Sequence, residues 1–159
     1  MFLPSKGHAK GHVSGDEKTK QKIYESYLKH FEYVNNWDLL DMSAYNIVGE
    51  YLLKKSKDPL FVWAKDPNLW MRRLAMVSTL AFIRKGEFAE TLAIAEMLLN
   101  DKEDLIHKAV GWMLREMGKR DQKVLESFLD KYSSKMPRTA LRYACERLPK
   151  NLARSYLIN

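Results

Sequence analysis

The chain has 159 residues, 46% hydrophobic and 30% charged, a balance that excludes a disordered protein and is typical of one soluble globular domain with a real core. The net charge of +7 favours polyanionic partners, with nucleic acid ahead of membrane because no strongly basic amphipathic segment presents an exposed apolar face. The single cysteine, Cys145, excludes an intrachain disulfide and fits a reducing compartment, and no apolar run approaches the roughly 20 residues of a membrane span.

Residues 1–15 are expected to form a flexible tail, native or not, because they mix Gly, His, Lys, Ser and Pro with few apolar residues and no periodicity. The segment lacks the apolar core of a signal peptide. His8 and His12 are interpreted as linker residues and not as ligands, so no metal site is predicted. The folded domain is then expected to span residues 16–159.

From Asp16 onward the patterning is helical throughout. Apolar residues recur at intervals of three and four, and the intervening turns are rich in Gly, Pro, Asn and Asp. Asn68 is expected to cap the helix that follows it, and Gly118 to end the helix that precedes it. The expected helices span residues 16–31, 37–55, 60–64, 69–84, 87–99, 103–117, 121–132, 138–148 and 151–156.

These helices arrive in pairs joined by short turns, with a period of roughly 35 residues, which predicts an all-α, HEAT-like helical-repeat solenoid, that is, an α-α superhelix. Trp37, Trp70 and Trp112 each lie near the beginning or middle of the second helix of a pair. The second helices of a solenoid line one concave surface. We therefore expect the three tryptophans to converge there.

Three segments carry candidate chemistry. Residues 35–41 (NNWDLLD) place Trp37 and Asp41 four positions apart, so that the indole and the carboxylate share one helix face and can receive a flat cation. Residues 68–73 (NLWMRR) and 108–116 (KAVGWMLRE) each set a tryptophan beside an arginine on an apolar helix. Trp63 lies outside these segments and is assigned to the core.

Taken together and in this order, the three segments resemble the DNA alkylation repair family of the AlkD type, with its N-W-D-x-x-D, W-x-x-R and K-A-x-G-W-x-L-R-E patterns. The resemblance covers about residues 16–157. Position by position, it implies an active site of Trp37, Asp41, Arg73 and Trp112. It further implies a DNA glycosylase of base excision repair that removes cationic N3- and N7-alkylated purines from duplex DNA without flipping the damaged base and without a cofactor.

The residue types suit that chemistry. Asp41 near C1′ can stabilise an oxocarbenium-like charge and orient an attacking water. Trp37 and Trp112 offer π faces to a cationic nucleotide, at about 0.5 to 2 kcal/mol for each contact. Arg73 is expected to clamp a phosphate with its planar fork.

The expected partner is double-stranded DNA that contains alkylated purines, and the expected location is the cytoplasm, at the nucleoid when DNA is bound. Charge and placement alone add Lys108, Arg115 and Arg138 to Arg73 as candidate phosphate contacts.

Plainer interpretations stay open. A tryptophan at helical spacing is usually core, Asp41 in an early helical turn is often a capping residue, and Arg73 beside Arg72 is compatible with a solvated surface. His107 is not needed as a base. The alternative functions are an inactive DNA-binding module and a protein-interaction module. The AlkD domain has further helices ahead of the Trp37 segment where this chain has one, and a second copy in a homodimer is one way to cover that apolar end.

Overall fold

Helices follow one another through residues 15–158, the part of the chain that this computed structural model describes, and no strand occurs among them. Two short 3₁₀ turns, Phe31–Tyr33 and Ser133–Lys135, and one π-helical segment, Ala44–Gly49, complete the elements. The α-helices are α1 (Glu17–Lys29), α2 (Trp37–Ser43), α3 (Glu50–Leu52), α4 (Asp58–Trp63), α5 (Leu69–Ser78), α6 (Leu80–Ile83), α7 (Ala89–Met97), α8 (Asp104–Arg120), α9 (Gln122–Tyr132), α10 (Arg138–Cys145) and α11 (Lys150–Leu157).

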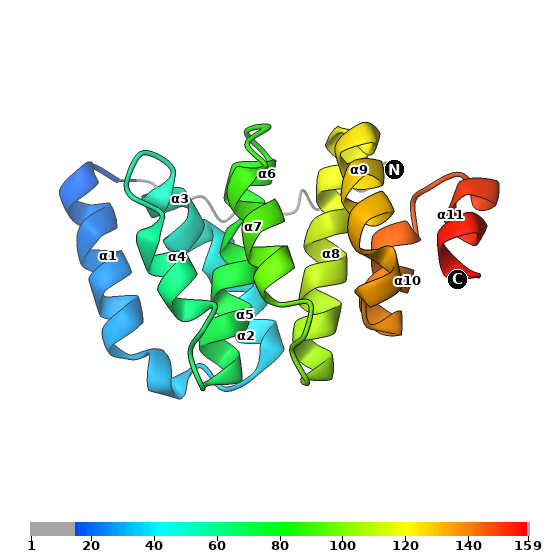
Figure 1. The fold of residues 1–159 in the computed structure, drawn as a ribbon. Coiled ribbons are helices and arrows are strands. Elements are labelled where there is room, and N and C mark those ends of the chain that lie inside the picture. The colour runs from blue at the N-terminus through cyan, green and yellow to red at the C-terminus, as the bar shows by residue number, and fades with distance from the viewer. Residues whose placement is uncertain (1–14, 159) are drawn as a thin grey trace, which may run out of the picture.

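The helices extend from α1 at one end of the molecule to α11 at the other (Figure 1). An inner series packs in sequence, with α2 and the π segment on α5, α5 on α8, and α8 on α10. Helices α4, α7 and α9 pack on this series, α4 on α5, α7 on α5 and α8, and α9 on α8. The predicted all-α helical-repeat fold is confirmed, while its HEAT-like character stays a prediction.

The core runs the length of the inner series. Residues 73–78 of α5 are all buried, and Leu74, Met76 and Met113 are fully so. Burying each such side chain contributes about 1.5 to 3 kcal/mol. Trp63 and Trp70 pack against this core while keeping part of their surface exposed. None of the described helices is long and apolar enough to cross a bilayer.

Polar caps start several of these helices where the sequence predicts. The Asn68 side chain accepts a hydrogen bond from the backbone N–H of Trp70 at 3.0 Å, as expected. Asp16 accepts one from Thr19 at 2.8 Å and so begins α1. The predicted tail, with His8 and His12, lies outside the described residues except for its last glycine.

The helix that begins at Trp37 is not uniform, although one continuous helix was predicted over 37–55. It widens into the π segment after α2 and returns to α-geometry in α3. A Cβ on Gly49 would lie 2.3 Å from the Ser78 carbonyl oxygen and 2.7 Å from the Ala81 Cβ. The end of the π segment can therefore approach the junction of α5 and α6 only because residue 49 is glycine.

The prediction that Gly118 ends its helix is wrong, because α8 continues through it to Arg120. A Cβ at position 118 would lie 2.4 Å from Leu125 Cδ2. The glycine thus serves close packing of α9 and not chain reversal, and Asp121 makes the break by capping α9.

Candidate functional site

A pocket of about 430 Å³ opens where α2, α5, α8 and α10 meet. Two residues not expected at the site, Leu105 and Tyr143, contribute to its wall. The other lining residues were all predicted as site residues: Trp37, Asp41, Arg73, Lys108, Trp112 and Arg115. The fold therefore gathers groups from three separated sequence segments into one cavity.

Helix α2 carries Trp37 and Asp41, two of the residues that line the pocket. The Asn36 side chain accepts a hydrogen bond from the Leu39 N–H at 2.9 Å, which fixes the first turn. Leu40 is fully buried and anchors the helix. Trp37 is 52% exposed, so the indole is open to a ligand, and Asp41 follows one turn later on the same face.

Asp41 and Arg73 form a two-pronged ion pair. Arg73 donates from Nε to Oδ1 at 2.9 Å and from Nη2 to Oδ2 at 2.8 Å. Its Nη1 donates to the carbonyl of Leu105, in the first turn of α8. Arg73 is 5% exposed, so its fork is used within the protein and links α2, α5 and α8. The expected phosphate clamp does not fit this inward orientation.

The carboxylate keeps capacity for a ligand. Its side chain is 15% exposed, against 6% for that of Arg73. An ionised carboxylate offers about four acceptor directions, and the arginine occupies two of them. The two bonds from Arg73 thus fix the orientation of the Asp41 carboxylate, and its remaining lone pairs are available to a ligand in the pocket.

The adjacent Arg72 has other hydrogen-bond partners than Arg73 and stabilises other parts of the fold. Its Nε donates to Asp101 at 2.7 Å, and its Nη1 donates to the carbonyls of Asp66 and Pro67 at 2.9 and 2.8 Å. These bonds hold the turns before α5 and α8. Neither arginine is therefore solvated surface, the plainer interpretation of the pair.

Basic groups at the rim are paired with exposed acids. Lys108 lies 3.0 Å from Asp104, and the hydrogen bond between them raises the pKa of Lys108 and lowers that of Asp104. Arg115 pairs with Glu146 beyond the end of α10. Ion pairs this exposed contribute little to stability, so an incoming phosphate can replace the acids at small cost.

Gly111 explains how Tyr143 reaches the pocket. A Cβ on Gly111 would lie 2.4 Å from Tyr143 Cβ and 2.6 Å from the Ala140 carbonyl oxygen. The glycine lets α10 pack directly against α8 beside Trp112. A glycine inside an apolar helix pattern is the sequence signal of this close approach, but it does not identify the residue that approaches.

Two expected participants, Trp70 and Arg138, lie elsewhere. Trp70 packs on the core and does not line the pocket, so the expected convergence of three tryptophans holds for only two. Arg138 donates to the carbonyl of Leu157 at the end of α11 and is also absent from the lining. His107, which was not expected to take part, forms a hydrogen bond between a ring nitrogen and the carbonyl of Asp101.

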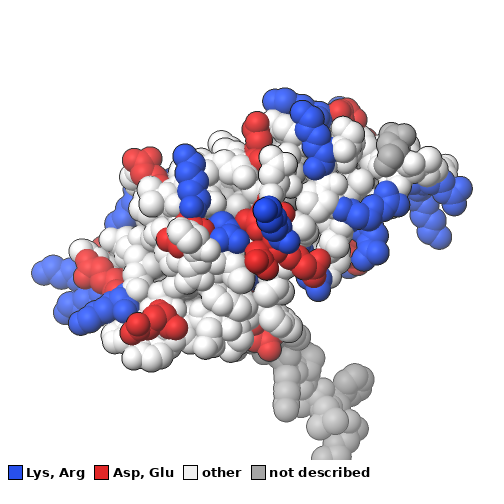
Figure 2. Space-filling view, turned by 60° about the horizontal axis from the view of Figure 1, so that its bottom comes forward, with Lys and Arg blue, Asp and Glu red and all other residues white. Residues whose placement is uncertain are grey.

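The surface charge is patchy. Figure 2 shows Lys and Arg side chains towards both ends of one face, with Asp and Glu among them near its centre. Residues 15–158 contain no cluster of His, Cys, Asp and Glu able to hold a metal ion. Lys108 and Arg115 are the cations that line the pocket together with Arg73.

Comparison with known proteins adds one finding. The profile of a family described as DNA alkylation repair enzyme matches residues 10–148, which include every residue that lines the pocket. No curated protein matches the chain.

Proposed function

The chain belongs to the DNA alkylation repair enzyme family, and from that premise and the geometry of the pocket we propose that it is a DNA glycosylase for cationic N3- and N7-alkylated purines in duplex DNA. One observation carries the proposal. A rigidly held carboxylate, Asp41, shares a pocket with two indole rings, and that pocket has cations at its rim.

The chemistry needs little more than electrostatics. An alkylated purine already carries positive charge, so the bond from C1′ to the base nitrogen breaks with its electron pair passing to the ring. The departing base becomes neutral, and the sugar becomes cationic. Asp41 faces the developing charge at C1′, and water then adds to that carbon and releases a proton.

Arg73 acts through Asp41. Its two parallel bonds fix both carboxylate oxygens, and its bond to the Leu105 carbonyl fixes the guanidinium in turn. Because Arg73 is buried, it is proposed as a positioning residue and not as a contact to DNA. Preorganised charge of this kind costs no rearrangement at the moment of reaction.

The remaining groups bind the substrate. Trp37 and Trp112 present π faces to the cationic base, and Lys108 and Arg115 contact phosphates beside it. Arg138 has no part in the proposal, because it is engaged by α11 outside the pocket.

The test is to incubate the protein with methylated duplex DNA and to measure free 3-methyladenine and 7-methylguanine. Asp41→Asn should lower the rate of base release about 10²- to 10³-fold, the usual cost of one preorganised electrostatic group, with duplex affinity retained. Asp38→Asn is the matched control, since Asp38 is an exposed acid on the same helix.

The other outcomes identify the alternatives. Salt-dependent duplex binding without base release would make the protein a DNA-binding module. Absence of both base release and salt-dependent binding would favour a protein-interaction module. Unchanged base release by the Asp41→Asn protein would remove this carboxylate from the mechanism.

A further inference from the structure

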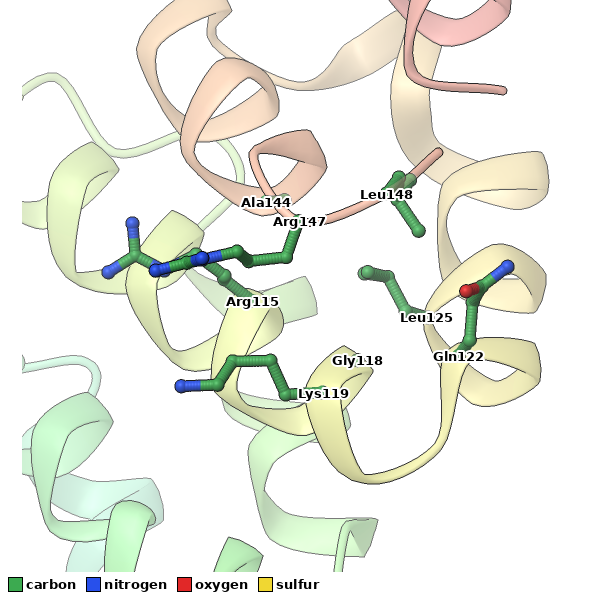
Figure 3. A pocket seen from close by; sticks show the side chains of 8 residues that line it. All are labelled: Arg115, Gly118, Lys119, Gln122, Leu125, Ala144, Arg147 and Leu148. Atoms are coloured by element: carbon green, nitrogen blue, oxygen red, sulfur yellow. The ribbon is translucent and has the colours of Figure 1, made fainter. Parts of the chain in front are cut away.

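A second hollow, of about 270 Å³, lies between α8, α9 and the end of α10 (Figure 3). The charged ends of Arg115, Lys119 and Arg147 lie together on one side of it. Leu125 and Leu148 lie on the other side, and Gly118 contributes to the wall between them. The hollow therefore has three cations on one side and two largely buried leucines on the other.

Arg115 belongs to both cavities, since it lines the Asp41 pocket as well as this hollow. Lys108, Arg115 and Lys119 stand seven and four residues apart on α8, so they share one helix face. At 1.5 Å per residue, the eleven steps from Lys108 to Lys119 cover about 16 Å. This row is long enough to reach DNA phosphates beyond those beside the Asp41 pocket.

The charges of the hollow are incompletely compensated. Arg115 pairs with Glu146, and Lys119 lies 3.1 Å from Glu116. Arg147 is exposed and makes no hydrogen bond or ion pair with any residue in the described part of the chain. A free guanidinium beside a second one offers two planar forks to an anion, and phosphate oxygens fit such forks.

We propose that this hollow is a second phosphate-binding subsite, which holds the DNA backbone a few nucleotides away from the damaged base. Arg147 and Lys119 contact phosphate oxygens, and the largely buried Leu125 and Leu148 form part of the wall of the subsite. The subsite rests on the proposed function for its ligand, but it takes no part in the chemistry. It anchors damaged and undamaged DNA alike.

Salt dependence of binding to undamaged duplex tests the subsite, with fluorescence anisotropy as the measurement. Arg147→Gln should lower the slope of log K against log salt by about one, as expected for one lost phosphate contact, and Lys119→Gln should act similarly. Arg120→Gln is the matched control, because Arg120 is an exposed cation beside Lys119 that does not line the hollow.

A slope unaffected by Arg147→Gln, or lowered equally by Arg120→Gln, would overturn the subsite. A single neutral methylphosphonate walked along each strand adds a second measurement. At the contacted phosphate its effect should not add to that of Arg147→Gln, whereas full additivity at every position would also overturn the proposal.

The two proposals fail in different ways. Base release together with an unaltered slope in Arg147→Gln would remove the subsite and leave the glycosylase. A lowered slope without base release from the wild-type protein would keep the subsite and remove the glycosylase.

Discussion

Arg73 and Asp41, 32 positions apart in the chain, form an ion pair with two hydrogen bonds of 2.9 and 2.8 Å. The pair joins α2 to α5 in the wall of the pocket, and the bond from Arg73 to the Leu105 carbonyl extends the link to α8. Because both side chains are largely shielded from water, replacing one of them leaves the other without its partner.

Arg73→Lys separates positioning from phosphate binding. A lysine keeps the charge but cannot hold both carboxylate oxygens, so the rate of base release should fall at least about tenfold. The salt dependence of duplex binding should stay the same, because Arg73 is buried. Single-turnover kinetics and a salt titration measure the two effects. If the slope of log K against log salt were instead lower by about one, Arg73 would contact a phosphate after all.

Arg72→Lys should behave in the opposite way. It weakens the bonds to Asp101 and to the carbonyls of Asp66 and Pro67, so the melting temperature should fall. Base release at a temperature where the protein is folded should not change. A loss of rate as large as that of Arg73→Lys would show that the two arginines are not distinct in role.

Trp37→Ala should weaken binding to alkylated DNA more than binding to undamaged DNA. The loss of one cation–π contact, about 0.5 to 2 kcal/mol, corresponds to about a 2- to 30-fold loss in affinity. Because Trp37 is 52% exposed, the free energy of unfolding should change by less than about 0.5 kcal/mol. Competition binding with matched duplexes measures the difference.

Trp63→Phe is the control for the indole, since Trp63 lies against the core away from the pocket. It should leave the preference for alkylated DNA intact. If Trp37→Ala weakened binding to both duplexes equally, its indole would be a general DNA contact and not a receptor for the cationic base.

Gly111→Ala should destabilise the protein and disturb the pocket. The added methyl group meets the Ala140 backbone and Tyr143 Cβ, neither of which can move freely, so a cost of about 1 to 3 kcal/mol is expected. Gly118→Ala meets mainly the flexible end of Leu125 and should cost less. Chemical denaturation ranks the two variants, and the reverse order would contradict this account of the contact between α8 and α10.

Chelation should not affect catalysis. The proposed chemistry uses only water and fixed charges. Base release should therefore be the same with and without EDTA after prior dialysis. A rate that fell with EDTA and recovered with added Mg²⁺ would require a different mechanism.

Local signals in the sequence account for most of the helices and for their pairing. Asn68 predicted a helix start because its side chain bonds a backbone N–H of the same segment, an interaction contained within a few residues. Their positions in the second helices predicted that Trp37 and Trp112 share one cavity, although the same reasoning placed Trp70 there wrongly. These parts of the fold and of the candidate site were therefore predictable.

The remainder depended on partners distant in the chain. Nothing near Arg73 in the sequence indicates whether its guanidinium meets a carboxylate or a phosphate, because Asp41 lies on another helix, 32 residues earlier. Tyr143 was missed for the same reason. Gly118 was misassigned because a glycine that ends a helix and one that admits a neighbouring helix look identical in sequence.

The π segment Ala44–Gly49 sets the phase between two parts of one helix. Helix α2, which precedes the π segment, carries Trp37 and Asp41. Gly49, at the end of the π segment, packs on the junction of α5 and α6. Removing a single residue between these parts would turn the first by about 100° relative to the second, as one step of an α-helix does. The indole and the carboxylate would then leave the cavity together, although no residue that touches DNA had been altered.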